Sequence, residues 1–181
     1  MSKLVIFIHG GDEDGYGADL KMADSLRVAL GETYEVHYPK MPSDETLPDF
    51  GWTEKIGHEI SSANRPIILV AHSLGASMLL KHLSENHSSK NISGIFLIAT
   101  PHWHGDEDWK RGLKLDKGFA EKIPKGIPIF LYHCKDDDVV SFEDMEYYAQ
   151  QLPQATVRRM TIGGHQLNND LSLVAKDITS L

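Results

Sequence analysis

The chain contains Ile67-Ile68-Leu69-Val70-Ala71-His72-Ser73-Leu74-Gly75-Ala76, in which an apolar run passes into a helix-like segment. The first five residues show no polar alternation, which is typical of a strand buried on both faces of a sheet. Residues 74–84 then have the spacing of a helix. A buried strand that leads directly into a helix is the repeating unit of a parallel sheet covered by helices. The segment therefore predicts an α/β fold.

The same alternation extends over the rest of the chain. Unbroken apolar runs cover residues 4–8, 95–99 and 127–132, and two more polar runs, 34–38 and 156–160, suit strands near a sheet edge. Helices are predicted at residues 19–30, 52–62, 116–122, 142–152 and 171–180, with Ser141-x-x-Asp144 as a capping box before the fourth of these. This order implies right-handed crossovers. We predict a three-layer sandwich with a mostly parallel sheet of six strands, as one domain over residues 1–181.

Composition and charge exclude several classes of protein. Of the 181 residues, 41% are hydrophobic and 24% are charged, which is the range of ordinary globular proteins. Eighteen basic and 26 acidic residues give a net charge of -8, so no nucleic-acid partner is expected. No apolar run reaches the roughly 18 residues that span a bilayer, so no membrane association is expected. Because Cys134 is the only cysteine and no secretory leader is visible, we expect a cytoplasmic protein. The sequence does not indicate an oligomeric state.

Ser73 lies between the predicted strand at residues 67–71 and the predicted helix at residues 74–84. Ala71 and Gly75, two residues before and after it, are small, which gives the pattern small-x-Ser-x-Gly. A serine in so tight a turn must adopt strained dihedral angles, and small flanking residues let the strand and helix backbones pass closely. The turn exposes the hydroxyl at a helix N-terminus, whose N–H groups favour negative charge. Ser73 is therefore a candidate nucleophile, and the alternative is an ordinary N-cap serine.

A carboxylate and a histidine follow Ser73 at the ends of two later strands. The fifth strand leads into Asp136-Asp137-Asp138, and the sixth leads into Gly163-Gly164-His165. A serine hydroxyl needs a base, and an imidazole needs a carboxylate that fixes its tautomer. We therefore predict a triad of Ser73, Asp137 and His165. Taken singly, the acidic triplet has the alternative of a solvated turn, and His165 that of a loop residue.

An oxyanion needs two preorganised donors. The backbone N–H of Leu74 is supplied by the turn itself, and Gly11 in the loop His9-Gly10-Gly11-Asp12 is predicted to supply the second. The alternative for these glycines is a plain tight turn. Two long loops, residues 39–49 and 100–115, are expected near the carboxyl ends of the strands, where ligands bind. Gly10, Trp103 and Trp109 are predicted to bind substrate, and the alternative for the tryptophans is packing of their loop onto the sheet.

These motifs resemble the α/β-hydrolases, and more narrowly the small lidless serine hydrolases of the retinoblastoma-binding-protein type. The resemblance spans nearly the whole chain. It rests on the His-Gly loop after the first strand, the turn around Ser73, Asp137 followed by Val140, and Gly164-His165-Gln166. It implies a core of six or seven strands without a cap domain, and a triad at the positions of Ser73, Asp137 and His165.

The chain departs from the pattern of these hydrolases at two positions. Ala71 stands where the first glycine is commoner, which is a conservative change. Cys134 occupies the place where many hydrolases carry His-Gly before the acidic turn, which leaves the choice of carboxylate open. The usual spacing His-Gly-x-x-Asp-x-x-Val selects Asp137 over Asp136 and Asp138. Cys134 itself lacks a following helix N-terminus and is expected to be a buried strand thiol.

His102-x-His104-x-Asp106 is similar to the zinc ligands of metallo-β-lactamase-like hydrolases, whose pattern is His-x-His-x-Asp-His. Two imidazoles two residues apart in a loop can share a divalent metal. However, Glu107 stands where the third histidine is expected, and no downstream ligand set is recognisable. The sequence therefore predicts no metal ion and no other cofactor.

The predicted activity is hydrolysis of a small soluble acyl ester or thioester through an acyl-enzyme, as in carboxylesterase-like enzymes of EC 3.1. A small-molecule acyl substrate is the expected partner, because the chain has no long insertion for a lid. The alternative is a catalytically retired hydrolase fold that serves as a binding or scaffold protein. Retention of the serine, the carboxylate, the histidine and the loop glycines favours the enzyme.

Overall fold

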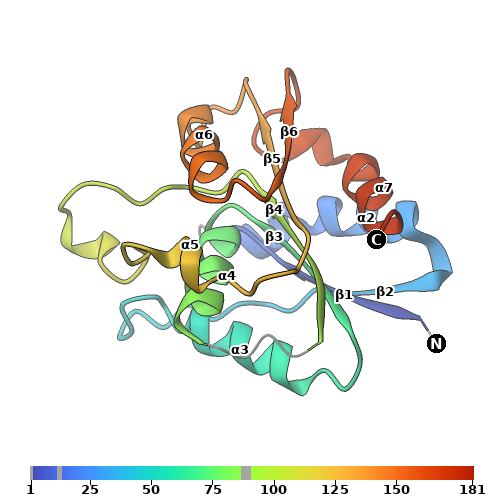
Figure 1. Ribbon diagram of the computed structural model, residues 1–181, viewed down its shortest axis with the longest axis horizontal. Helices are drawn as coiled ribbons and strands as arrows, with labels where there is room; N and C mark the ends of the chain where they lie inside the picture. Colours follow the sequence, from blue (N-terminus) through green and yellow to red (C-terminus); the bar gives the residue numbers. More distant parts are fainter. Residues whose placement is uncertain (1, 12–13, 87–90) are drawn as a thin grey trace.

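Six strands form one sheet in the order β2-β1-β3-β4-β5-β6 (Figure 1). The computed structural model describes residues 2–11, 14–86 and 91–181. Every neighbouring pair of strands is parallel. The strands are β1 (Lys3–Ile8), β2 (Tyr34–His37), β3 (Ile67–His72), β4 (Ile92–Ile98), β5 (Ile129–Cys134) and β6 (Thr156–Met160). The predicted α/β sandwich around a six-stranded sheet is confirmed.

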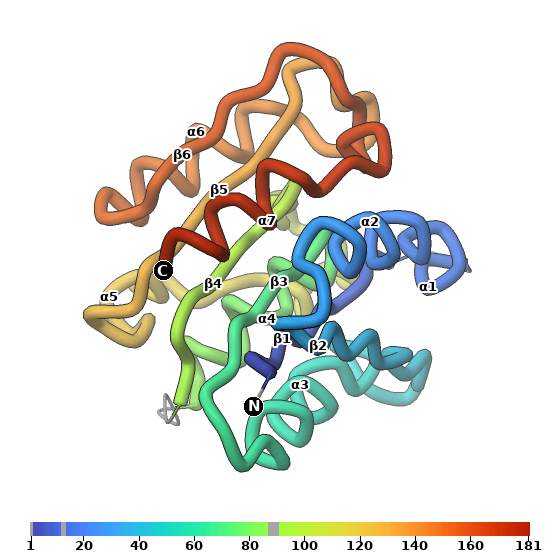
Figure 2. The backbone as a smooth tube through the Cα atoms, turned by 90° about the vertical axis from the view of Figure 1, so that its right-hand side faces the viewer, coloured from blue at the N-terminus to red at the C-terminus, as the bar shows by residue number. Residues whose placement is uncertain are grey.

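Helices cover both faces of the sheet (Figure 1). One face, turned toward the viewer in Figure 2, carries α2 (Leu20–Leu30) and α7 (Ser172–Thr179). The other carries α3 (Trp52–Ser62), α4 (Leu74–Glu85), α5 (Phe119–Lys122) and α6 (Phe142–Gln151). The short elements are α1 (Gly15–Ala18), η1 (Gly31–Thr33), η2 (Asp108–Lys110) and η3 (Leu167–Asn169). Within the described part of the chain, none of the helices has the length and apolar character to span a membrane.

The central strand β3 is buried along its whole length and divides its side chains between two cores. Leu69 and Ala71 pack into the core beneath α3 and α4, whereas Ile68 and Val70 pack into the core beneath α2 and α7. This alternation follows from the two-residue repeat of a strand. Because both faces are covered, the sequence of the strand shows no polar alternation. Each fully buried aliphatic side chain stabilises the fold by about 1.5–3 kcal/mol.

Several predicted bounds differ from the observed ones. β4 begins at Ile92, three residues earlier than predicted, because Ile92 pairs with Ile67 of β3. β5 begins at Ile129 and ends at Cys134, two residues later at both ends than predicted. Pro128 has no N–H group and contributes only its carbonyl, which accepts from Ile95. Helix α1 was not predicted, because four residues with two glycines have weak helix propensity.

The capping box predicted before α6 is only half formed. The Ser141 hydroxyl accepts the N–H of Glu143 at 3.2 Å. The Asp144 carboxylate, predicted to bond back to the N-cap, instead accepts the N–H of His102 at 2.9 Å. This part of the prediction is wrong, because a loop distant in sequence supplies the donor. Asp144 therefore ties the loop after β4 to α6.

The strand order brings two loops together at the carboxyl ends of the neighbouring strands β1 and β3. After β1 the chain continues to β2 on one side, whereas after β3 it continues to β4 on the other side. In open α/β sheets the carboxyl ends of the strands at such a point form the usual ligand site. The loop after β1 and the turn at Ser73 after β3 both lie there.

Candidate active site

Ser73 forms the one-residue turn between β3 and α4. Its dihedral angles are φ 51° and ψ -124°, a conformation that residues other than glycine rarely adopt. Its backbone N–H donates to the carbonyl of Ile98 at 2.8 Å, which fixes the turn against β4. Although Ser73 occupies the N-cap position of α4, its side chain makes no capping hydrogen bond. The observed geometry thus differs from that of an ordinary N-cap serine, and the hydroxyl is not engaged by the helix.

Gly75 permits the close approach that this turn requires. A Cβ atom at position 75 would overlap the carbonyl oxygen of His9 and lie 2.9 Å from that of Ile8. The first turn of α4 therefore meets the end of β1 backbone to backbone. Ala71, on the other side of Ser73, is fully buried in the sheet. The small-x-Ser-x-Gly pattern has this steric cause.

His165 lies in the loop after β6 and bonds to Asp137. Its Nδ1–H donates to Asp137 Oδ2 at 2.9 Å. Gly163 and Gly164 shape the loop with φ angles of 153° and 60°, which favour glycine. Their N–H groups both donate to the Asp136 carboxylate, at 3.2 and 2.9 Å. Within the acidic triplet, Asp137 thus meets the imidazole, and Asp136 holds the loop that carries it.

Four donors converge on the Asp137 side chain, which is fully buried. Its Oδ1 accepts the N–H groups of Val139 and Val140, both at 2.9 Å. Its Oδ2 accepts from His165 and from His133 Nε2–H, the latter at 3.0 Å. Burial alone would raise the pKa of Asp137, but these hydrogen bonds outweigh it and hold the pKa well below its ordinary value. The carboxylate is therefore ionised.

His133 is a site residue to which the sequence interpretation gave no role. Its Nε2–H is shared between Asp137 and the Val140 carbonyl, which it reaches at 3.0 Å. The ring is 1% exposed, at the end of β5. The signal in the sequence was its place four residues before Asp137, which is the position of the histidine in the His-Gly-x-x-Asp spacing.

Ser73 and His165 line the same cavity, which has a volume of about 160 Å³. Gly10 and Gly11 from the loop after β1, together with Gln166, line it as well. Among the residues that the structure describes, none forms a hydrogen bond to Nε2 of His165. That nitrogen can therefore take a proton from a group bound in the cavity. Of the residues predicted to bind substrate, Gly10 is placed here.

Gly11 and Leu74, the predicted oxyanion donors, lie against each other. A Cβ atom on Gly11 would be 2.9 Å from Cδ2 of Leu74. Both residues line a second cavity of about 260 Å³, whose wall includes Phe50 and Trp52. The sequence interpretation missed these two aromatic residues, and the long loop 39–49 that precedes them was the only signal. Asp12, the last residue of the predicted loop, lies outside the described residues.

Trp103 and Trp109 lie on the loop between β4 and α5 and contact each other edge to face, with ring centroids 5.8 Å apart. Trp103 packs against the core, and its Nε1–H donates to the Ser77 hydroxyl of α4 at 2.9 Å. Trp109 is exposed. Neither residue lines the two cavities beside Ser73. This placement favours loop packing for Trp103, and substrate binding by either tryptophan stays a prediction.

A second histidine–aspartate pair, His72 and Asp19, lies directly behind the turn. His72 Nδ1 and Asp19 Oδ2 are 2.6 Å apart, and the two side chains are 1% and 2% exposed. His72 Nε2 lies 2.9 Å from the backbone carbonyl of His165, and the two rings are 4.5 Å apart. Asp19 also accepts the N–H of Gly10 at 2.7 Å. The pair thus connects the loop after β1 to the loop that carries His165.

Asp19 is held as a buried carboxylate. Burial would raise the pKa of Asp19, but the hydrogen bond with His72 and the N–H of Gly10 lower the pKa below its ordinary value. On the other side of the ring, His72 Nε2 donates to the His165 carbonyl, which can only accept. The pair is therefore a buried, hydrogen-bonded link in which both nitrogens of His72 have an oxygen partner.

His9 links the loops on either side of the second cavity. Its Nδ1–H donates to the Gly10 carbonyl at 2.6 Å, and its Nε2 accepts the N–H of Met41 at 2.9 Å. Burial lowers the pKa of His9, so the ring is neutral, as this pattern of one donor and one acceptor requires. His9 therefore holds the loop after β1 against the loop that follows β2.

Known structures share this architecture. The ydeN gene product of B. subtilis is 22% identical, with 99% of this chain and 98% of that chain covered and a TM-score of 0.74. A predicted CIB-like hydrolase from Thermoplasma acidophilum is 17% identical, with 99% and 87% covered and a TM-score of 0.75. A meta-cleavage product hydrolase from Pseudomonas fluorescens reaches a TM-score of 0.78 at 14% identity, with 99% and 91% covered. At such identities these similarities establish the fold.

A shorter similarity exists to a curated protein. A UPF0173 metal-dependent hydrolase of Pyrococcus horikoshii is 31% identical over 80 residues, which are 44% of this chain. The aligned part covers 33% of that relative, so the similarity spans about a third of its length.

The fold is that of the α/β-hydrolases, and no cap domain is inserted between the elements of the described residues. The serine hydrolase family matches residues 30–172, which is most of the chain. The chain therefore belongs to the serine hydrolase family, and the resemblance predicted from the sequence is confirmed.

Proposed function

We propose that this protein hydrolyses small acyl esters or thioesters, with Ser73 as nucleophile, His165 as base and Asp137 as the carboxylate that orients the base. The observation that carries the proposal is the Asp137–His165 hydrogen bond beside the cavity that also contains Ser73. Membership in the serine hydrolase family supports hydrolysis in general. Four hydrogen bonds to Asp137 keep its pKa low, which supports its role as a fixed anion rather than a proton acceptor.

In the first step, the Ser73 oxygen attacks the acyl carbonyl carbon while its proton passes to His165 Nε2. The bond from His165 Nδ1–H to Asp137 keeps Nε2 unprotonated beforehand and stabilises the imidazolium afterwards. The carbonyl electron pair moves to oxygen and creates a tetrahedral oxyanion. The N–H groups of Leu74 and Gly11 are proposed to donate hydrogen bonds to this oxyanion. The contact between Gly11, in the loop after β1, and Leu74, at the start of α4, supports this role.

In the second half, His165 returns its proton to the leaving alcohol or thiol as the carbon–oxygen or carbon–sulfur bond breaks. Water then attacks the acyl-enzyme and gives its proton to His165 Nε2, and Ser73 leaves with that proton as the acid is released. One histidine thus serves twice as base and twice as acid, so the cycle needs no external group.

The two cavities suggest which substrates fit. They share Gly11, so an acyl carbonyl at the predicted oxyanion donors could extend into the cavity of about 260 Å³. Phe50, Trp52 and Leu74 give this cavity an apolar wall. Trp52 is held in place because its Nε1–H donates to the Pro42 carbonyl at 2.9 Å. A fixed apolar wall of this size suits a short acyl chain, which supports a carboxylesterase-like activity of the EC 3.1 type.

The proposed setting is the cytoplasm, with a small molecule as the partner. Cys134 is the only cysteine in the sequence, so no internal disulfide can form. It is buried, and burial with nearby Asp136 and Asp137 raises the pKa of the thiol to about 11, which makes it unreactive. The net charge of -8 argues against a nucleic-acid partner.

Labelling with a fluorophosphonate, followed by intact-mass measurement, tests the nucleophile. We expect one adduct per chain in the wild type and none in Ser73→Ala. Ser61→Ala, which alters an exposed serine on α3, is the matched control and should be labelled like the wild type. A folded wild type that stays unmodified would overturn the proposal and favour the retired, ligand-binding alternative.

A series of p-nitrophenyl esters with lengthening acyl chains tests the substrate class. We expect kcat/KM to be highest for short chains and to fall once the chain exceeds the second cavity. The variant Phe50→Ala, which enlarges that cavity, should move the optimum toward longer chains. An optimum at long chains in the wild type would contradict the assignment of the acyl pocket.

A further inference from the structure

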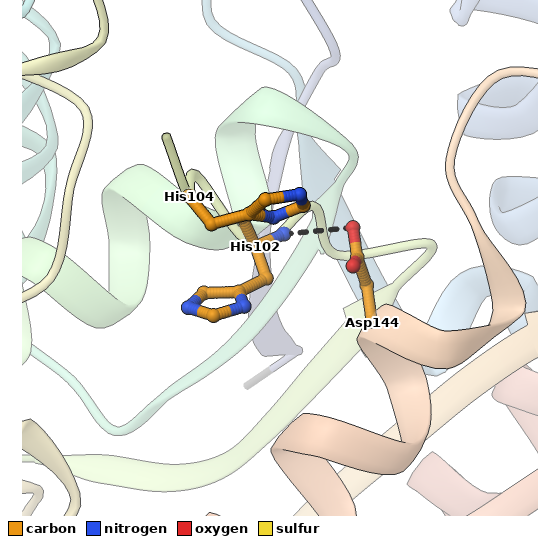
Figure 3. Close-up of side chains that lie close together, drawn as sticks. All are labelled: His102, His104 and Asp144. Atoms are coloured by element: carbon orange, nitrogen blue, oxygen red, sulfur yellow. Dashed lines mark hydrogen bonds between the residues drawn. The ribbon is translucent and has the colours of Figure 1, made fainter. Parts of the chain in front are cut away.

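Two histidines and an aspartate gather outside the proposed active site (Figure 3). His102 and His104 lie on the loop after β4, and Asp144 lies in the first turn of α6. One ligand atom from each residue lies within 4.8 Å of those of the other two. The sequence pattern had suggested Asp106 as the companion of the two histidines. Among the residues described, the structure instead brings Asp144 to them, 40 residues or more along the chain.

Contacts with the loop backbone and with α6 orient the two histidine rings. His104 Nδ1 lies 2.9 Å from the carbonyl of His102, which can only accept, so Nδ1 carries the proton and Nε2 is left with its lone pair. A ligating histidine typically donates its other N–H to a carbonyl in this way. The His102 ring stacks on Tyr147 with centroids 3.7 Å apart, which fixes the orientation of the ring.

Asp144 is already positioned toward the loop. Its Oδ2 accepts the backbone N–H of His102 at 2.9 Å, and no hydrogen bond within the described residues engages its Oδ1. The loop and the helix are thus joined before any ion binds. Because one oxygen of the carboxylate is used for this positioning, the other is available as a ligand.

The donor set selects a class of metal ion. Two imidazole nitrogens and one carboxylate oxygen suit zinc and similar divalent transition metals, whereas calcium and magnesium prefer oxygen ligands. With bonds of about 2.0 Å, tetrahedral ligands are about 3.3 Å apart. The observed group must therefore contract, and the exposed His104 ring has the freedom to move.

We propose that His102, His104 and Asp144 bind one zinc-class divalent ion, with water in the remaining positions, and that the ion fastens the loop after β4 to α6. The site shares no residue with the proposed triad, so the proposal does not depend on the proposed function. No metal was predicted from the sequence, because Glu107 replaces the third histidine of the local pattern and no downstream ligand set was recognisable. Here the third ligand comes from a different element.

Titration of the full chain with cobalt(II) chloride, followed by its visible absorption, tests the site, and zinc chloride competition gives the zinc affinity. We expect one ion per chain. His104→Ala and Asp144→Asn should weaken binding by at least about 10-fold, because each removes one ligand. His104 is exposed, so its replacement is not expected to disturb folding. Zinc should also raise Tm in the wild type and not in His104→Ala.

Three control variants make the test specific. Asp106→Asn removes the carboxylate suggested by the sequence pattern, and His58→Ala removes an exposed histidine on α3, so both should bind like the wild type. His165→Ala should also bind like the wild type. Binding that survives in His104→Ala and Asp144→Asn but is lost in His165→Ala would place the ion at Ser73 and overturn the proposal. Absence of stoichiometric binding at millimolar cobalt or zinc would overturn it as well.

Discussion

His165–Asp137 and His72–Asp19 are the same two residue types at nearly the same place, with rings 4.5 Å apart, yet their chemistry differs. His165 is bonded at Nδ1, and its Nε2 faces the cavity that contains Ser73. Both nitrogens of His72 already have oxygen partners, one on Asp19 and one on the backbone of His165. The number of partners around each imidazole therefore separates a ring with a free nitrogen at the cavity from a ring that is bonded on both sides.

The His72–Asp19 pair also supports the position of the His165–Asp137 pair. His72 bonds to the backbone carbonyl of His165, and Asp19 bonds to the N–H of Gly10, next to the proposed oxyanion donor. A buried, hydrogen-bonded pair thus holds both loops that meet at Ser73. This comparison leads to four predictions about what each pair contributes.

The largest expected effect is that of His165→Ala on catalysis. Loss of the proposed base should lower kcat for ester hydrolysis by roughly 1,000- to 1,000,000-fold. The free energy of unfolding should change by only about 1–2 kcal/mol, because Asp137 keeps three other donors. Steady-state kinetics and urea denaturation of the same variant measure the two quantities. Retention of more than a tenth of kcat would contradict the role of His165.

Asp19→Ala should mainly affect stability. It removes the buried partner of both His72 Nδ1 and the Gly10 N–H, and each buried polar group left unsatisfied costs about 1–3 kcal/mol of unfolding free energy. Urea denaturation near neutral pH measures this loss. Asp24→Ala in α2 is the matched control, because the Asp24–Arg27 pair is exposed and contributes about 0–1 kcal/mol. Equal losses in the two variants would show that the buried His72–Asp19 pair does not stabilise the fold.

His133→Leu should have an intermediate effect. It removes one of the four donors to Asp137, which should lower the free energy of unfolding by about 1–3 kcal/mol and raise the pKa of Asp137 toward its ordinary value. Because the Asp137–His165 bond remains, kcat should fall less than tenfold. A fall in kcat as large as that of His165→Ala would mean that His133, and not Asp137 alone, orients the base.

The smallest expected effect is a slope of stability with pH. The pKa of Asp137 lies well below that of an aspartate in the unfolded chain, which is about 3.9. The unfolded state therefore takes up the proton first, and stability falls as the pH is lowered from about 5 to about 2. Thermal unfolding across this range should show a shallower slope in Asp137→Asn than in the wild type. Identical slopes would contradict the assignment of an ionised, strongly bonded carboxylate.

Most of the fold could be predicted because its signals are local. The buried strands show unbroken apolar runs, and β6 and α3 have the bounds expected from the sequence. The turn at Ser73 could be recognised from two small residues within a five-residue pattern. The order of Ser73, Asp137 and His165 and their positions after strands were equally visible, which is why the sequence could select the three residues of the proposed triad.

The remaining features join residues that are distant in sequence and share no local pattern. Asp19 precedes α2 and is 53 residues from His72, so the sequence alone made it an ordinary helix start. Asp144 was assigned to a capping box and is used by His102 instead, 42 residues away. Trp103 was expected in a pocket because it is aromatic and lies in a loop, but its indole N–H found Ser77 on α4. In each case a tertiary partner decided the role.

The backbone contact between Gly75 and the end of β1 has a consequence for protein engineering. Since no side chain can be accommodated there, any substitution at position 75 would push the start of α4 away from the end of β1. Selectivity would instead have to be altered through Pro42, Glu45 and Phe50, which line the second cavity from the segment before α3. Libraries for directed evolution should therefore randomise this segment and leave position 75 untouched.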